Sequence, residues 1–177
     1  MPREPRNDEE LCKASDHVVY EIERLCGTLH DLEQLNLAHD AGQDPSLWTH
    51  DALLESWTIH LRNTMHFLRG QQARASDILA EDYFDGSAWY ELLAGIPGRP
   101  GIVAQVDEAS LDRRINKEIV HLTYDRIGIT VAQKQWPIGL VSQHLGRDLF
   151  VFVENVSSER VALSFDDRAR TALRMLG

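Results

Sequence analysis

The stretch Leu53-Leu-Glu-Ser-Trp-Thr-Ile-His-Leu-Arg-Asn-Thr-Met-His-Phe-Leu68 decides the fold class. Its apolar residues recur three or four positions apart, and they fall within an arc of about 120° when each residue turns a helix by about 100°. This spacing is typical of an amphipathic helix with one core-facing side. Asp44 and Pro45 are typical of a helix start, and Gly70 is typical of a helix end. We therefore expect a helix from about residue 44 to Gly70.

The same periodicity extends outward over most of the chain. It predicts a long first helix from Leu11 to about Ala38, a third over residues 103–127 and a fourth from Pro137 toward Val156. Residues 77–84 and 87–93 read as two short helical pieces broken at Asp85-Gly86, and a Pro/Gly loop follows over residues 95–101. Residues 1–8 are expected to be frayed, and residues 157–177 are ambiguous between strand and helix. The sequence predicts an all-α single domain over residues 1–177, an up-and-down bundle of four to five main helices with a short irregular middle segment.

Composition limits the classes of protein that the chain can belong to. Its 177 residues are 43% hydrophobic and 26% charged, which suits one globular domain with its own core. The start is polar where a secretory signal is apolar, and no apolar run approaches the roughly 18 residues that span a bilayer. Cys12 and Cys26 are about 21 Å apart if both lie on one helix, too far for a disulfide. We expect a cytoplasmic protein with reduced thiols and no membrane span.

A polar stripe is expected on the third long helix. Arg114, Glu118, His121 and Asp125 are spaced at i, i+4, i+7 and i+11, so they share one helix face at the border of the apolar residues Ile115, Ile119 and Leu122. They could be ordinary surface ion pairs that stabilise a helix by a few tenths of a kcal/mol each. Alternatively, the Arg could bind phosphate and the His could transfer a proton near neutral pH. That second interpretation suits phosphodiester cleavage.

The segment Arg114-Ile-Asn-Lys-Glu-Ile-Val-His121 resembles the motif of the HEPN superfamily of helical, often dimeric domains. Many members are metal-independent ribonucleases of bacterial toxin or antiviral systems, in which an Arg and a His from two subunits line a cleft that binds RNA. The resemblance implies that Arg114 and His121 are catalytic, that the protein is a homodimer, and that RNA and an antitoxin protein are possible partners. Asn116, Lys117 and Tyr124 become candidates for binding or orienting the substrate.

Two further candidates lie on the second helix. His60 is either a core histidine with a satisfied partner, or it faces the Arg114/His121 stripe together with Asn63 and orients His121 or contacts substrate. Residues 60–75 also hold Arg62, Arg69 and Arg74 and no acid, in a protein of net charge −10. We expect a local positive potential there, unless this is only a solvated helix end.

Other chemistries find little support in the sequence. His60 and His66 point about 120° apart on one helix and could not share an ion, so we expect no metal and no cofactor. A Walker loop, a dinucleotide fingerprint, a GxSxG turn and a CxxC pair are absent from the sequence, which gives no support to nucleotide hydrolysis or redox chemistry. The alternative to a ribonuclease is a non-catalytic helical interaction or structural module.

Overall fold

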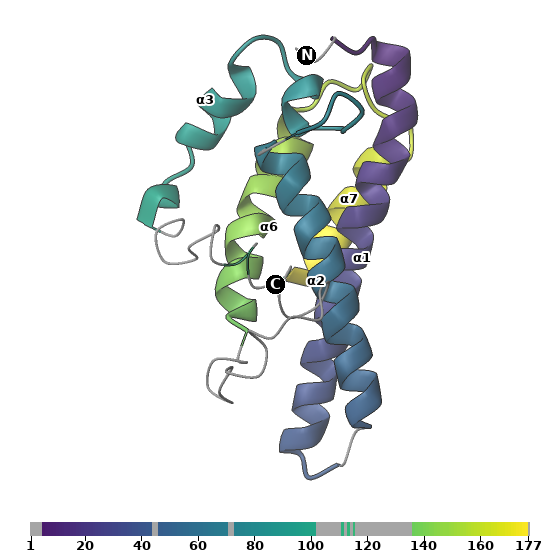
Figure 1. Ribbon diagram of the computed structural model, residues 1–177, viewed down its shortest axis with the longest axis vertical. Coiled ribbons are helices and arrows are strands. Elements are labelled where there is room, and N and C mark those ends of the chain that lie inside the picture. Colours follow the sequence, from purple (N-terminus) through teal and green to yellow (C-terminus); the bar gives the residue numbers. More distant parts are fainter. Residues whose placement is uncertain are drawn as a thin grey trace.

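The described structure is all-helical. A computed structural model of the chain describes residues 5–43, 46–70, 73–101, 111, 113, 115 and 136–176. Every regular element within these ranges is a helix, which confirms the all-α prediction (Figure 1). The elements are α1 (Asp8–Asp40), α2 (Leu47–Arg69), η1 (Ala80–Tyr83), α3 (Ala88–Ala94), α6 (Ile138–Asn155), α7 (Phe165–Leu173) and η5 (Arg174–Leu176).

The first helix starts at a capping box. The amide of Glu10 donates to the Asn7 side chain at 2.9 Å, and the amide of Asn7 donates to the Glu10 carboxylate at 3.2 Å. These two bonds satisfy backbone donors that would otherwise be left over at a helix start. Asp8, which was expected to belong to the frayed start, is the first residue of α1, and residues 1–4 lie outside the described residues.

The second helix, α2, ends at Gly70, as the sequence predicted. Gly70 follows Arg69 with φ +61°, and its amide donates to the carbonyl of His66 at 2.9 Å. A left-handed residue at this position is a common helix end, and glycine adopts it without a Cβ penalty. Asp44 and Pro45, the expected start signals, lie outside the described residues.

The middle and the tail differ in detail from the sequence expectation. The first middle piece, predicted over residues 77–84, forms only the single 3-10 turn η1, whereas the second forms α3. The break at Gly86 is confirmed, with φ +59°. The ambiguous tail forms helix α7 from Phe165, and acidic Asp166 and Asp167 in its first turn favour a helix start.

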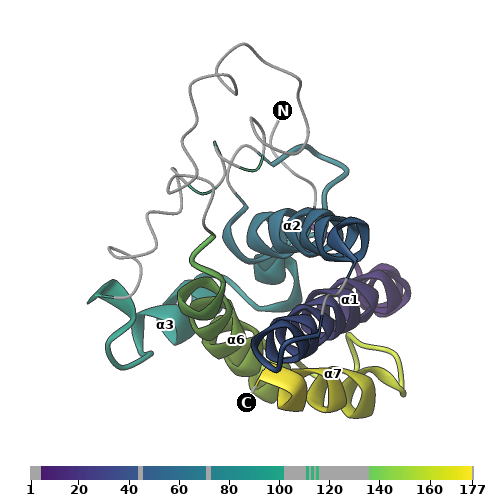
Figure 2. The same ribbon diagram turned by 90° about the horizontal axis from the view of Figure 1, so that it is seen from below.

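An aromatic cluster in the core is centred on Phe152 of α6. Phe152 of α6 meets Phe67 of α2, Tyr83 of η1, Trp89 of α3 and Phe165 of α7 edge to face, with ring centroids 5.0–6.2 Å apart. Such aromatic pairs contribute about 0.5–1.5 kcal/mol each beyond the area that they bury. Figure 2 shows α6 between α3 on one side and α1 and α7 on the other.

Two further expectations are tested by the fold. Within the described ranges, no helix is both long and apolar enough to cross a bilayer. Both cysteines are free thiols, Cys26 in the core and Cys12 half-buried. Burial raises the pKa of Cys26 to about 12, so this thiol stays protonated at neutral pH.

Candidate functional site

Only three residues in or next to the predicted catalytic motif are described. Arg114 and His121 lie outside the described residues, as do Asn116, Lys117 and Tyr124. Leu111 and Ile115 of the same segment are helical and buried, with 3% and 0% of their surface exposed, whereas Arg113 is exposed. The core-facing position expected for Ile115 is therefore confirmed.

His60 has a partner on the first helix. Its Nδ1 lies 2.7 Å from the carboxylate of Glu21, and its ring meets that of Tyr20 edge to face at 5.9 Å. Only 13% of the imidazole is exposed. His60 thus matches the expectation of a satisfied histidine between packed helices, and its expected contact with the Arg114/His121 stripe lies outside the described residues.

Asn63 is exposed and lines a small cleft between α1 and α2. The cleft holds about 220 Å³ and is also lined by His17, Glu21 and His66. The Nε2 atom of His66 lies 2.9 Å from the carboxylate of Asp77. A neutral imidazole that donates from Nε2 keeps a lone pair on Nδ1, which is the arrangement of a general base.

The carboxylate behind His66 is held in its charged form. The backbone amide of Arg74 donates to Asp77 at 2.7 Å, and this bond is the largest cause that lowers the Asp77 pKa. The contact with His66 lowers the pKa further, while partial burial opposes both. The His66–Asp77 pair thus joins an imidazole to a charged carboxylate beside the cleft, an arrangement that the sequence did not indicate.

A buried charged cluster is the largest departure from the sequence expectation. Asp148 of α6 is fully buried and lies 2.8 Å from a guanidinium nitrogen of Arg69. Arg99 donates to both oxygens of the same carboxylate, at 3.0 and 3.1 Å. Arg69 also lies 2.9 Å from Nε2 of His144, which is 1% exposed. We call Arg69, Arg99, His144 and Asp148 the buried charged cluster.

This cluster changes the interpretation of the basic stretch over residues 60–75. Arg69 had been counted toward a local positive potential, but only 10% of its side chain is exposed and Asp148 neutralises part of its charge. The acid comes from α6, nearly eighty positions away in the sequence, so the stretch alone could not show it. A signal did exist, because His144 and Asp148 are polar residues four positions apart among the apolar Val141, Leu145 and Leu149.

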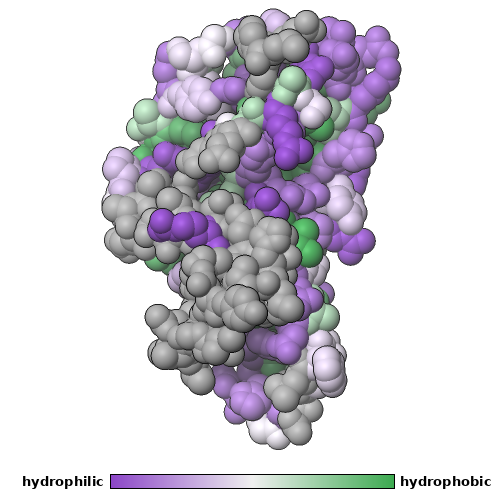
Figure 3. Space-filling model, viewed as in Figure 1, coloured by the Kyte–Doolittle hydropathy of each residue, from purple (hydrophilic) through white to green (hydrophobic). Residues whose placement is uncertain are grey.

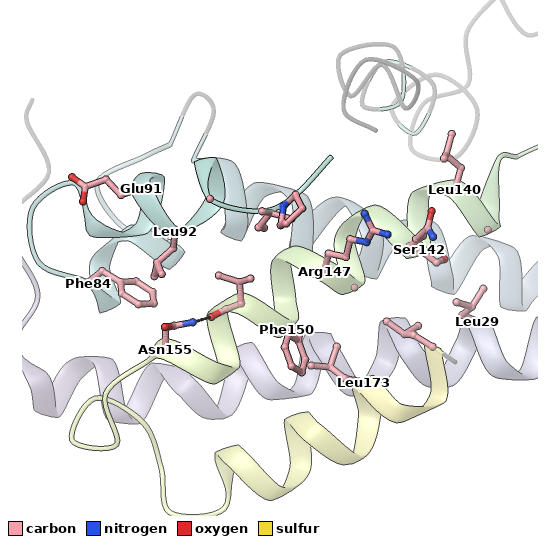
Figure 4. Close-up of a pocket in the computed structure, with 18 of the residues that line it drawn as sticks. Leu29, Phe84, Glu91, Leu92, Leu140, Ser142, Arg147, Phe150, Asn155 and Leu173 are labelled. Carbon is pink, nitrogen blue, oxygen red and sulfur yellow. Dashed lines mark hydrogen bonds between the residues drawn. The ribbon is translucent and has the colours of Figure 1, made fainter. Parts of the chain in front are cut away.

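A wide groove follows the outer face of α6. It holds about 1610 Å³ and lies between α3 and the C-terminal end of α7 with η5 (Figure 4). Small and apolar residues of α6 form its floor, among them Gly139, Gly146 and Phe150. Arg147 projects beside them and makes no ion pair or hydrogen bond with the described residues. An open apolar groove along a helix suits binding of another protein segment better than catalysis.

Metal binding has no geometric support in the described ranges, where no three His, Cys, Asp or Glu side chains lie close enough to hold an ion. Glu118 and His121 have the Glu-x-x-His spacing used by metal-binding bundles. The prediction that no metal binds did not take this spacing into account. Both residues lie outside the described ranges.

Comparisons of the chain with protein-family models, curated proteins and solved structures found no match. The residues themselves must therefore carry any functional argument. They offer one sequence motif, Arg114 to His121, and two arrangements in the described structure: the His66–Asp77 pair in a cleft and the groove along α6.

Proposed function

We propose that this chain is a HEPN-like, RNA-cleaving or RNA-binding protein of a bacterial stress or defence system. The observation that carries the proposal is the Arg114-to-His121 motif on a segment whose Leu111 and Ile115 are buried while Arg113 is exposed. A segment with one face in the core and another in water offers border positions where a side chain can be both oriented and accessible. The motif starts at the position between Arg113 and Ile115 in the sequence.

The proposed reaction needs only the RNA, an arginine and a histidine. The 2′-hydroxyl of RNA attacks the adjacent phosphorus, the new 2′-O–P bond forms, and the bond to the 5′-oxygen of the next nucleotide breaks. His121 takes the proton of the 2′-hydroxyl, and the leaving 5′-oxygen gains a proton from water or from the protonated imidazole. Arg114 stabilises the negative charge that builds on the phosphate oxygens. The products are a 2′,3′-cyclic phosphate end and a 5′-hydroxyl end.

The other candidate residues differ in whether they could contact RNA directly. Asn63 is exposed and can contact RNA directly, whereas His60 is held by Glu21 and could act only as a positioning residue. Asn116, Lys117 and Tyr124 keep the role of binding or orienting the substrate. A homodimer would bring two copies of the motif together, and an antitoxin could block the resulting cleft.

The first prediction is that the protein cleaves single-stranded RNA in excess EDTA and leaves 2′,3′-cyclic phosphate ends. His121→Ala should slow cleavage by about 10²- to 10⁴-fold because proton transfer is lost, and Arg114→Ala should cost a comparable factor. Arg113→Ala is the matched control, since it removes an exposed arginine from the adjacent position and should leave the rate unchanged.

Three outcomes would reject this proposal. The first is that the protein neither cleaves nor binds any RNA of a broad panel. The second is that the wild type and both variants cleave RNA equally fast. The third is that EDTA abolishes the activity. The last outcome would favour an ion held by Glu118 and His121.

The second candidate function is a non-catalytic interaction module, and the groove along α6 favours it. Phe150, on the floor of the groove, is 55% exposed. Arg147 also lines the groove and has no ion-pair partner among the described residues. Absence of RNA cleavage and of RNA binding, together with retained folding, would make this module the better interpretation.

A further inference from the structure

The joined ends of α1 and α2 form a projecting hairpin. In Figure 1 these ends extend below the lower end of α6, and Figure 3 shows mainly hydrophilic and neutral colours there, outside the grey atoms. The side of α2 that faces the core carries Trp57, Leu61 and Leu68, all at most 1% exposed. The opposite side of the same helix is available for contact with another molecule.

That opposite side carries a regular exposed stripe. Trp48, Asp51, Glu55 and Ile59 are spaced at i, i+3, i+7 and i+11, so they project from one face of α2. Trp48 is 85% exposed and Ile59 is 47% exposed, and the two carboxylates lie between them. We call these four residues the α2 outer stripe. It runs for about 17 Å at 1.5 Å per residue, the length of three helical turns.

The charge of the hairpin that carries the stripe is one-sided. The sequence has no Lys or Arg between Arg24 and Arg62. The carboxylates of Asp51 and Glu55 are exposed, as are those of three residues on the neighbouring half of α1: Asp31, Glu33 and Asp40. In the part of the chain that the structure describes, none of the five pairs with a Lys or Arg. Acids elsewhere commonly do, for example Asp85 with Arg160 and Glu23 with Arg168.

We propose that the α2 outer stripe is a docking surface for a basic amphipathic helix of a partner protein. The apolar side chains of that helix would cover Trp48 and Ile59, and its Lys or Arg side chains would pair with Asp51 and Glu55. An exposed tryptophan next to charged groups is the kind of anchor that carries binding energy at protein interfaces. Asp51 lies 3.6 Å from the imidazole of His50, but neither it nor Glu55 pairs with a Lys or Arg of the described residues. Such acids attract a basic segment over a longer range and raise its association rate.

The charge also decides against other occupants. A second copy would bring a hairpin end with the same five carboxylates, and like charges placed together are unfavourable. Nucleic acid would meet the same repulsion from its phosphates. The docking surface is therefore separate from the proposed RNA site and does not rest on it.

The second prediction tests this surface with a fluorescein-labelled helical peptide of about 16 residues. The peptide carries Leu on one helix face and Lys on the opposite face. Fluorescence anisotropy should show binding to the wild-type protein, and binding should weaken as salt is added. Trp48→Ala should weaken binding at least tenfold, and the double variant Asp51→Asn with Glu55→Gln should weaken it and reduce its salt dependence. Leu163→Ala and Glu159→Gln are matched controls on the tail, because both residues are exposed, and neither should change the affinity.

Several results would overturn the proposal. Equal affinity of wild type and Trp48→Ala, or equal binding of a peptide in which Glu replaces Lys, would show that the stripe does not select a basic helix. A wild-type dimer that Trp48→Ala converts to a monomer would assign the stripe to a second copy instead. Trp48→Ala should cleave RNA as fast as wild type, so failure of either proposal can be recognised separately.

Discussion

Asp148 is a fully buried carboxylate that two arginines contact in the core. A charge without water is costly, and such a group is tolerated only when its partners are close and well aligned. Here Arg99 contacts both oxygens while Arg69 contacts one of them. Loss of the carboxylate charge would leave two largely buried guanidinium groups without the negative charge that balances them.

The third prediction follows from that arrangement. Asp148→Asn should lower the free energy of unfolding by about 3–5 kcal/mol, the usual effect of breaking a buried ion pair on one side. Urea unfolding followed by circular dichroism would measure it. Asp166→Asn is the comparison, because it breaks a solvent-exposed pair with Arg170 and should lose much less stability. Equal losses in the two variants would mean that burial does not set the strength of the Asp148 contacts.

The contributions of single residues could be predicted only in part. The predicted burial of Ile115 and of the apolar face of α2 was correct, because helical periodicity is a local property of the sequence. The partners of Asp148 come from positions 69 and 99, so only the folded chain brings them together. The His66–Asp77 contact was likewise missed because residue 77 was predicted to begin a helical piece, whereas in the structure Asp77 lies in the loop before η1.

At the scale of elements, glycines show how position decides what one residue does. Gly70 ends α2 with φ +61°, and a Cβ there would lie 2.8 Å from a methyl carbon of Leu79. Gly27 lies in the middle of α1, and a Cβ there would meet no atom within 4 Å.

The fourth prediction uses these two glycines as a matched pair. Gly70→Ala should destabilise the protein by about 1–2 kcal/mol, since an L side chain is disfavoured in the left-handed region. Gly27→Ala should stabilise it by about 0.5–1 kcal/mol because alanine loses less backbone entropy inside a helix. Thermal unfolding of both variants would measure the difference. Shifts of the same sign would contradict the assigned end of α2.

Element bounds were predicted well where the apolar pattern was long. The predicted end of α2 was correct, and α6 runs over Ile138–Asn155 within one residue of the expectation. The short middle pieces were harder, because in a segment of about eight residues the packing of Tyr83 and Phe84 outweighs helix propensity. In the tail, Val161 and Leu163 would share one face of a strand, but Val161 is buried and Leu163 is fully exposed, because both lie in the turns before α7.

At the scale of the whole molecule, the proposed composite site requires two copies. The fifth prediction is therefore a dimer, with a mass twice the 20.1 kDa of one chain in light scattering at micromolar concentration. RNA cleavage should then fall when dilution favours the monomer. A stable monomer that cleaves RNA at full rate would exclude a site shared between subunits.

The aromatic contacts of Phe152 have a consequence for how the protein unfolds. One ring on α6 contacts side chains from α2, η1, α3 and α7, so the departure of any one of these elements exposes part of a ring that the others also contact. Cooperativity of this kind concentrates the loss of structure into one calorimetric transition for the core end of the bundle. The projecting ends of α1 and α2 lie outside that unit, and their amides should exchange with deuterium first.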